Sequence, residues 1–153
     1  PRVVQAGQAS LATPICFEDS FGPYWASFKQ PDAFVVLTDD SWGKSIALQN
    51  QHLAMSVFRA AETASVVLRT SATGVTAAIA PNGAIIGRLA HFQPGVLIAE
   101  FPLGQATTSA YEAWGKAISP LLLIAGAIAA ALAYAAAIRS RAKQKTISKR
   151  VSD

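Results

Sequence analysis

The sequence is poor in the residues on which many enzymes depend. Its 153 residues include one cysteine, Cys16, and two histidines, His52 and His91. A single cysteine excludes an internal disulfide and a cysteine-rich metal site, and the two histidines lack the spacing of metal ligands. The GxSxG, P-loop, HExxH and GxGxxG motifs are also missing, so serine-hydrolase, nucleotide-binding and zinc functions have no support. We expect no metal and no other cofactor.

Charge is absent from one long segment near the end of the chain. Residues 118–138 carry no charged side chain, and a helix of this length spans roughly 31 Å, close to the hydrocarbon thickness of a bilayer. Tyr111 and Trp114 precede the segment, where aromatic rings favour the membrane interface. The alternative is a buried, alanine-rich helix of a soluble protein. Such a helix should carry a polar stripe, and Ser119 and Tyr134 are too few to form one.

The positive charge of the chain is concentrated after this segment. Residues 139–153 hold six lysines and arginines and one aspartate, and the remainder is nearly neutral. Loops rich in lysine and arginine stay in the cytoplasm, so we expect a cytoplasmic C-terminus and a domain on the other side of the membrane. No basic patch precedes the segment, and a nucleic-acid partner is therefore not expected.

These features divide the chain into four predicted parts. Residues 1–110 form a globular domain, 111–117 an interfacial linker, 118–138 a transmembrane helix and 139–153 a basic tail. The sequence starts at Pro1 without a signal peptide. A C-terminal helix alone does not export the domain that precedes it, so we expect the chain to be the C-terminal piece of a longer polypeptide.

Apolar runs alternate with helical patterns in the domain, which predicts an α/β fold. The predicted strands and helices, in chain order, are strand 10–16, a helix from Asp19 or Ser20 to Lys29, strand 33–38, helix 46–64 and strand 66–69. The helix 46–64 is expected to bury a stripe of Leu48, Met55, Phe58 and Ala61.

A different pattern follows in the second part of the domain. Strands are predicted at 74–80 and 84–89, on either side of Pro81, Asn82 and Gly83. Asn-Gly between two β-rich runs is a strong signal for a hairpin. The apolar run 96–101 is predicted as one more strand, and the polar segment 102–115 as turns.

Cys16 is the candidate nucleophile because it follows a predicted strand and precedes a predicted helix. Backbone N–H groups at the start of a helix can stabilise a thiolate and hold an oxyanion, and the N–H of Phe17 is placed for that role. Glu18 could orient a partner or a neighbouring amine. The alternative is that Cys16 is a small buried side chain without chemistry.

Asp39, Asp40 and Trp42 follow the next predicted strand. The carboxyl ends of strands form ligand crevices in α/β sheets, which makes Asp40 and Trp42 candidate substrate-binding residues. The aspartates could instead form a turn or a helix cap, and Trp42 could be a packed aromatic side chain. Lys44 is interpreted as a surface charge. Arg59 and Glu62 have the spacing of a structural ion pair on a helix.

Taken together, these segments resemble the apolipoprotein N-acyltransferase family, a membrane branch of the nitrilase (carbon–nitrogen hydrolase) superfamily. The matching segments are Thr13-Pro14-Ile15-Cys16-Phe17-Glu18, Thr38-Asp39-Asp40-Ser41-Trp42, Gln51-His52 with Arg59-Ala60-Ala61-Glu62, and the stretch from Arg69 through Gly74 and Thr76 to the Pro81-Asn82-Gly83 turn. The final apolar helix and its basic tail match as well. The sequence departs from the family where Phe17 replaces a frequent tyrosine, Asp39 a usual asparagine and Ala72 a common polar residue.

The resemblance implies the C-terminal part of an αββα sandwich, followed by one transmembrane helix. It implies that Cys16 takes a fatty acyl group from a phospholipid as a thioester and that the N-terminal amine of a diacylglyceryl-modified prolipoprotein then accepts it. Glu18 matches a supporting glutamate. The general-base glutamate and the lysine of the superfamily are expected upstream of Pro1, so the chain alone is expected to be inactive.

Two further functions stay open at this point. A membrane-tethered amidase of the nitrilase type would keep Cys16 as the nucleophile and hydrolyse a small carbon–nitrogen bond. An anchored binding module would leave Cys16 unreactive.

Overall fold

The computed structural model describes residues 2–28, 30–102 and 108–152, and it divides the chain into two units, Pro1–Ala113 and Trp114–Asp153. The first unit holds a six-stranded sheet in the order β1-β2-β3-β4-β5-β6. Its elements are β1 (Val3–Ala6), β2 (Ala9–Ala12), the 3-10 helix η1 (Cys16–Ser20), α1 (Gly22–Trp25), β3 (Ala33–Thr38), the 3-10 helix η2 (Ser41–Gly43), α2 (Ile46–Thr63), β4 (Val66–Ser71), β5 (Ala77–Ile79) and β6 (Ile85–Arg88).

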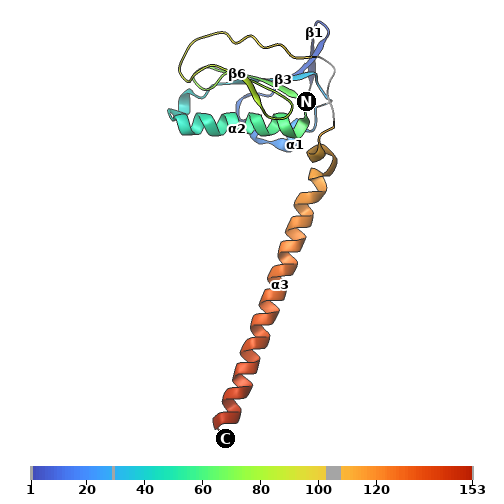
Figure 1. Cartoon of the computed structure of the whole chain (residues 1–153), viewed down its shortest axis with the longest axis vertical. Coiled ribbons are helices and arrows are strands. Elements are labelled where there is room, and N and C mark those ends of the chain that lie inside the picture. Colours follow the sequence, from blue (N-terminus) through green and yellow to red (C-terminus); the bar gives the residue numbers. More distant parts are fainter. Residues whose placement is uncertain (1, 29, 103–107, 153) are drawn as a thin grey trace. The chain divides into compact units, whose positions relative to one another are not determined.

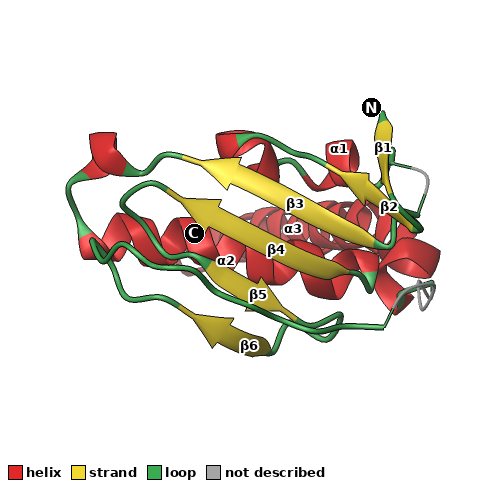
Figure 2. Cartoon of the chain, turned by 90° about the horizontal axis from the view of Figure 1, so that it is seen from above, coloured by secondary structure: helices red, strands yellow, loops and turns green. Residues whose placement is uncertain are grey.

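The centre of the sheet is parallel and its edges are antiparallel. β2, β3 and β4 pair in parallel, and η1, α1 and α2 lie in the connections between them. The hairpin β5–β6 and the strand β1 complete the sheet with antiparallel pairs. Figure 2 shows that β2, β3 and β4 point the same way, so their carboxyl ends meet at one edge. The predicted α/β class is therefore confirmed.

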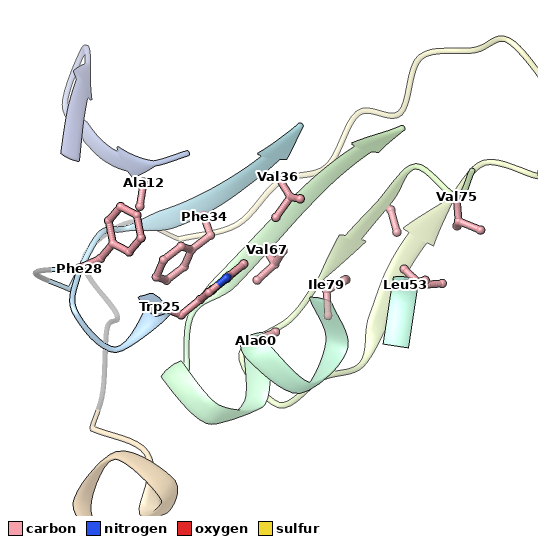
Figure 3. Packing of buried hydrophobic residues seen from close by; sticks show 11 residues of the cluster. Ala12, Trp25, Phe28, Phe34, Val36, Leu53, Ala60, Val67, Val75 and Ile79 are labelled. Carbon is pink, nitrogen blue, oxygen red and sulfur yellow. The ribbon is translucent and has the colours of Figure 1, made fainter. Parts of the chain in front are cut away.

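The hydrophobic core lies between one face of the sheet and the helices α1 and α2 (Figures 1 and 3). Trp25 of α1 stacks on Phe34 of β3 at a centroid distance of 4.3 Å, and Phe28 packs edge-on against Phe34. Val36 and Val67 continue this layer along β3 and β4, and both are fully buried. β-branched and aromatic side chains on alternate strand positions explain this packing.

The other face of the sheet has a loop across it. Residues 89–102 form an irregular segment, and part of it lines a groove of about 740 Å³ together with Val35, Leu68 and Ala78. The predicted strand at 96–101 is therefore wrong. An apolar run forms a strand only where a neighbouring strand pairs with it. In this loop Val96 and Ile98 are each 86% exposed, and the residues that alternate with them are half-buried without pairing to a strand.

Several predicted boundaries also need correction. The strand expected at 10–16 ends at Ala12, although Ile15 still forms an isolated parallel bridge with Leu37. The helix expected from residue 19 or 20 to Lys29 is replaced by η1 and the short α1, because Gly22 and Pro23 start a new helix there. Lys29 itself lies outside the described residues.

The β5–β6 hairpin confirms the Asn-Gly prediction. Gly83 has a φ of 82°, which glycine adopts without strain, and Asn82 Oδ1 accepts a hydrogen bond from the Ala84 N–H at 3.0 Å. The strands on either side are shorter than the predicted 74–80 and 84–89. The strand predicted at 66–69 extends to Ser71 instead.

The second unit is the greater part of helix α3 (Ala110–Ser152). Its segment Ala117–Arg139 is long and apolar enough to cross a membrane, which agrees with the span predicted at 118–138. Ser109 caps the helix by accepting a hydrogen bond from the Glu112 N–H at 2.9 Å. The turns predicted up to residue 115 are wrong after Ser109, since residues 111–117 are helical, and 103–107 lie outside the described residues.

Candidate active site

Cys16 occupies a strained corner where β2 has ended and η1 begins. Its φ is 51°, a left-handed conformation that a non-glycine residue rarely adopts. Such outliers persist only where surrounding interactions hold them, and they concentrate at functional sites. The side chain is half-buried, between the exposed Ile15 and Phe17.

Glu18 is one of the groups that hold this corner. Its Oε2 atom accepts a hydrogen bond from the Ile15 N–H at 2.7 Å, and its own N–H donates to the Ile15 carbonyl oxygen at 3.1 Å. Burial, the negative charge of Glu18 and a hydrogen bond to Glu18 together raise the pKa of Tyr24. Glu18 thus contacts the backbone that precedes Cys16, and its predicted supporting role stays a prediction.

The parallel register brings the end of β3 to the same corner. Ile15 pairs with Leu37, and the next residue along β3, Thr38, has its Oγ1 atom 3.5 Å from Cys16 Sγ. The same Thr38 Oγ1 lies 3.3 Å from Oδ1 of Asp40. A chain of polar atoms therefore leads from the sulfur into the interior of the domain.

Asp40 belongs to a buried network of charges that we call the buried ion network: Asp19, Asp40, His52 and Arg69. Each of its members has no more than 3% of its surface exposed. Arg69 of β4 bridges the two carboxylates, at 2.6 Å to Asp19 Oδ2 and 3.1 Å to Asp40 Oδ2. Ser56 of α2 donates to Asp19 at 2.7 Å and accepts from Arg69 at 2.9 Å.

His52 lies between the same two carboxylates. Its Nδ1 atom is 2.5 Å from Asp40 Oδ1, and its Nε2 atom is 3.0 Å from Asp19 Oδ1, an ion-pair distance without the alignment of a hydrogen bond. Burial and the charge of Arg69 disfavour the imidazolium, but the two carboxylates outweigh them and raise the pKa of His52. Burial likewise disfavours the Asp40 carboxylate, yet His52, Arg69 and Ser71 together lower the pKa of Asp40.

Gly74 closes the network from the loop after β4. A Cβ atom at this position would collide with Asp40 Oδ2 and with Ser71 Oγ. The Gly74 N–H donates to Ser71 Oγ at 2.9 Å, and that hydroxyl donates to Asp40 Oδ2 at 3.1 Å. A glycine is required here because the backbone passes directly over the buried carboxylate.

The structure brings some of the predicted site residues together and separates others. Cys16, Phe17 and Glu18 form one corner, to which Asp40 connects through Thr38. Asp40 is fully buried, so direct contact with a substrate stays a prediction that this geometry does not favour. Trp42 lies in η2 and is 61% exposed, so it is not a packed aromatic side chain of the core, which was the alternative interpretation. Asp39 accepts from the Ser41 N–H at 2.9 Å in a turn.

Sequence reasoning missed most of the buried ion network. Asp19 was expected to cap a helix, but it is buried in η1. The stripe predicted for α2 is also wrong: Phe58 is 63% exposed, and the buried face of the helix carries Gln49, His52, Leu53, Ser56 and Ala60. The helical spacing of 49, 52 and 56 was the available signal for a polar buried face.

Comparisons with known proteins show the family to which the chain belongs. The profile of the carbon-nitrogen hydrolase family matches residues 1–111, and the chain therefore belongs to the carbon–nitrogen hydrolase family. It is similar to apolipoprotein N-acyltransferase 1 of Treponema pallidum, with 40% identity over 82% of this chain and 25% of that protein. It is also similar to apolipoprotein N-acyltransferase of Geobacter metallireducens, with 30% identity over 86% of this chain and 25% of that protein.

A solved structure supports the fold. An amidase from Nesterenkonia sp. AN1 superimposes with a TM-score of 0.53 at 21% identity, covering 67% of this chain and 42% of that one. The likeness establishes a nitrilase-like fold, as predicted. The chain spans about a quarter of the length of these curated acyltransferases, so the activity of a whole protein is a matter for proposal.

Proposed function

We propose that this chain is the nucleophile-bearing part of an apolipoprotein N-acyltransferase, with Cys16 as the nucleophile. The observation that carries the proposal is the strained corner at Cys16, with φ of 51°, in a chain that is 40% identical to a protein of that name. A nucleophile presented on a strained turn is accessible from outside while its backbone is held from inside.

The proposed reaction has two steps. The Cys16 sulfur attacks the carbonyl carbon of a phospholipid acyl ester, forms a thioester and releases a lysophospholipid. The free α-amine of a diacylglyceryl-modified N-terminal cysteine then attacks the thioester, which forms an amide and returns the thiol. Dividing the transfer into two steps lowers each barrier. In this proposal the backbone N–H of Phe17 holds the oxyanion, and Glu18 supports the corner.

The surroundings of Cys16 suit lipid substrates. Three exposed apolar side chains lie within five residues of it, and we call them the apolar rim: Ile15 at 60%, Phe17 at 51% and Phe21 at 58% exposure. Exposed apolar groups next to a nucleophile offer contacts for acyl chains. Trp42 of η2, the substrate-binding candidate predicted from the sequence, is exposed as well and in this proposal contacts substrate.

The membrane arrangement belongs to the same proposal. Segment Ala117–Arg139 would cross the inner membrane, with the basic tail in the cytoplasm and the sheet domain outside it. Both lipid substrates would then be reached from the outer leaflet. The related proteins are named acyltransferases, which favours transfer to an amine over the hydrolysis expected of a tethered amidase.

The test uses the full-length protein that contains this chain. Cys16→Ala and Cys16→Ser should abolish acyl transfer from phospholipid to a diacylglyceryl-cysteine peptide and leave membrane insertion unchanged. Mass spectrometry should find a fatty-acyl adduct on Cys16 when phospholipid is supplied without acceptor. An alanine variant that still acylates the peptide would disprove the assignment. Release of free fatty acid in place of acylated peptide would support a hydrolase, and an unmodified Cys16 would support a binding module.

A further inference from the structure

We propose that the Thr38 hydroxyl donates a hydrogen bond to the sulfur of Cys16 when that sulfur is an anion, and that the buried ion network orients this hydroxyl. The inference rests on the nucleophilic role of Cys16 proposed above. It assigns a thiolate-stabilising role to Thr38, a residue at the end of β3 that has no part in the reaction steps proposed above.

The position of Thr38 is fixed from both sides of the strand. On one side, the bridge between Ile15 and Leu37 sets the register of the Cys16 corner against β3. On the other side, the Ala72 N–H donates to the Thr38 carbonyl oxygen at 3.1 Å. Thr38 is a β-branched residue at the end of a paired strand, so its side chain has little rotamer freedom. The distance of 3.5 Å between Thr38 Oγ1 and Cys16 Sγ is thus a property of the fold.

The proton of this hydroxyl has two acceptors. Cys16 Sγ is 3.5 Å away and Asp40 Oδ1 is 3.3 Å away. While Cys16 is a thiol, its S–H can donate to Thr38 Oγ1, and Thr38 donates to the Asp40 carboxylate. When Cys16 is a thiolate, the sulfur only accepts, and rotation of the hydroxyl brings the proton to it. No heavy atom has to move between the two arrangements.

Asp40 can release the Thr38 proton without losing its other partners. Its two oxygens remain in contact with His52 Nδ1, Arg69 Nη2 and Ser71 Oγ. A buried carboxylate with these partners is still satisfied, so turning the hydroxyl toward sulfur leaves no buried acceptor empty. The fixed carboxylate therefore holds the Thr38 hydroxyl beside the sulfur and remains satisfied when the proton turns toward it.

The charges around this hydroxyl come from every element that packs at the corner. Asp19 and Glu18 lie on η1, Asp40 follows β3, His52 lies on α2 and Arg69 on β4. With His52 protonated, the two carboxylates and two cations of the buried ion network balance. A neutral network beneath the corner does not repel a forming thiolate, as an unpaired carboxylate at this position would.

The test measures the rate at which iodoacetamide alkylates Cys16 in the full-length protein in detergent, as a function of pH. The Cys16 peptide is quantified by mass spectrometry. Thr38→Val keeps the branched shape and removes the hydroxyl. The pH midpoint of alkylation should rise by about one unit or more, the effect of losing one hydrogen bond to a charged group. Thr38→Ser keeps a hydroxyl and should restore the wild-type midpoint.

Thr63→Val is the matched control, because it removes a threonine hydroxyl that donates to the Arg59 carbonyl oxygen at the far end of α2. Its midpoint should equal that of the wild type. Thr38→Ala replaces the valine variant should that variant fail to fold. An unchanged midpoint in a folded Thr38 variant without a hydroxyl would overturn the proposal. Alkylation requires neither phospholipid nor acceptor, so a shifted midpoint supports the role of Thr38 even where no thioester forms.

Discussion

At the Cys16 corner the charged side chains lie inside and the apolar side chains lie outside. This is the reverse of the usual distribution between the interior and the surface of a protein. Beneath the corner lie two carboxylates, a guanidinium and an imidazole, all buried. Around it lie the exposed side chains of Ile15, Phe17 and Phe21. Charged residues are almost never fully buried unless they are paired, and exposed apolar groups gathered at one place mark contact surfaces.

The comparison separates two tasks that a nucleophile site has to fulfil. The interior ties η1, α2, β4 and the turn after β3 together through directional bonds, directly next to the strained backbone at Cys16. The side chains of the apolar rim form no ion pairs or hydrogen bonds because they are hydrocarbon, and they can adapt to flexible lipid chains. We therefore expect substitutions in the network to reduce the stability of the fold, and substitutions in the rim to change the use of substrates.

The largest effect is expected from Arg69→Met. The substitution leaves Asp19 and Asp40 as buried carboxylates without their cation, which costs about 3–5 kcal/mol of unfolding free energy. Arg88→Met is the control, since Arg88 is an exposed arginine on β6, and its effect should stay within about 0.5 kcal/mol. Denaturant unfolding and limited proteolysis of the full-length protein in detergent measure both. Equal stability of the two variants would show that the network does not hold the domain together.

A smaller effect is expected from the titration of His52, because one proton changes in place of a whole side chain. The pKa of His52 is raised from its ordinary value of 6.5. Its contribution to stability is therefore complete below pH 6.5 and is lost as the pH rises through the raised value. The pKa of Asp40 is lowered from 3.8, so its contribution is complete above pH 3.8 and is lost only in stronger acid.

The measurement is the difference in thermal midpoint between the wild-type protein and His52→Gln across this pH range. The glutamine keeps a polar side chain but does not titrate, so the subtraction removes the contributions of all other groups. The advantage of the wild type should shrink as the pH rises above 6.5. A difference in thermal midpoint that stays constant or grows with pH would mean that His52 is neutral in the folded protein.

The parts of the fold that could be predicted are those that depend on residues close to one another in the sequence. The continuous apolar run of β3 and the Asn-Gly turn between β5 and β6 carry local signals, and the structure confirms both. The turn at Cys16 was predicted from a strand followed by a polar helix start, but β2 ends at Ala12 and the 3-10 helix η1 begins at Cys16 itself. The strand expected at 96–101 failed because pairing depends on a partner that no local pattern reveals.

The buried ion network could not be predicted in the same way. Asp19, His52 and Arg69 are far apart in sequence, and each alone has the ordinary interpretation of a surface charge or a cap. Only the parallel register of β3 and β4, together with the face that α2 turns to the sheet, brings them within ion-pair distance. One local sign was Arg69 itself, which shares a strand face with the buried Val67.

The smallest effect on stability is expected in the apolar rim, from Phe21→Ser. Phe21 is 58% exposed and touches Phe17 edge-on at a centroid distance of 6.3 Å. Its loss should cost about 1 kcal/mol or less, since much of the ring is already in water. Under the proposed function, the KM for a long-chain phospholipid donor should rise, while a short-chain water-soluble ester is used as before.

Phe58→Ser is the matched control for the rim, because Phe58 is a similarly exposed phenylalanine, at 63%, on α2. It should leave the KM for both donors unchanged. A chain-length effect confined to Phe21→Ser would show that the apolar rim contacts acyl chains, and it would separate the two tasks by experiment. Should both variants weaken the use of long-chain donors equally, the effect would reflect general contact of the domain with lipid, and the division between a rigid interior and an adaptable rim would fail.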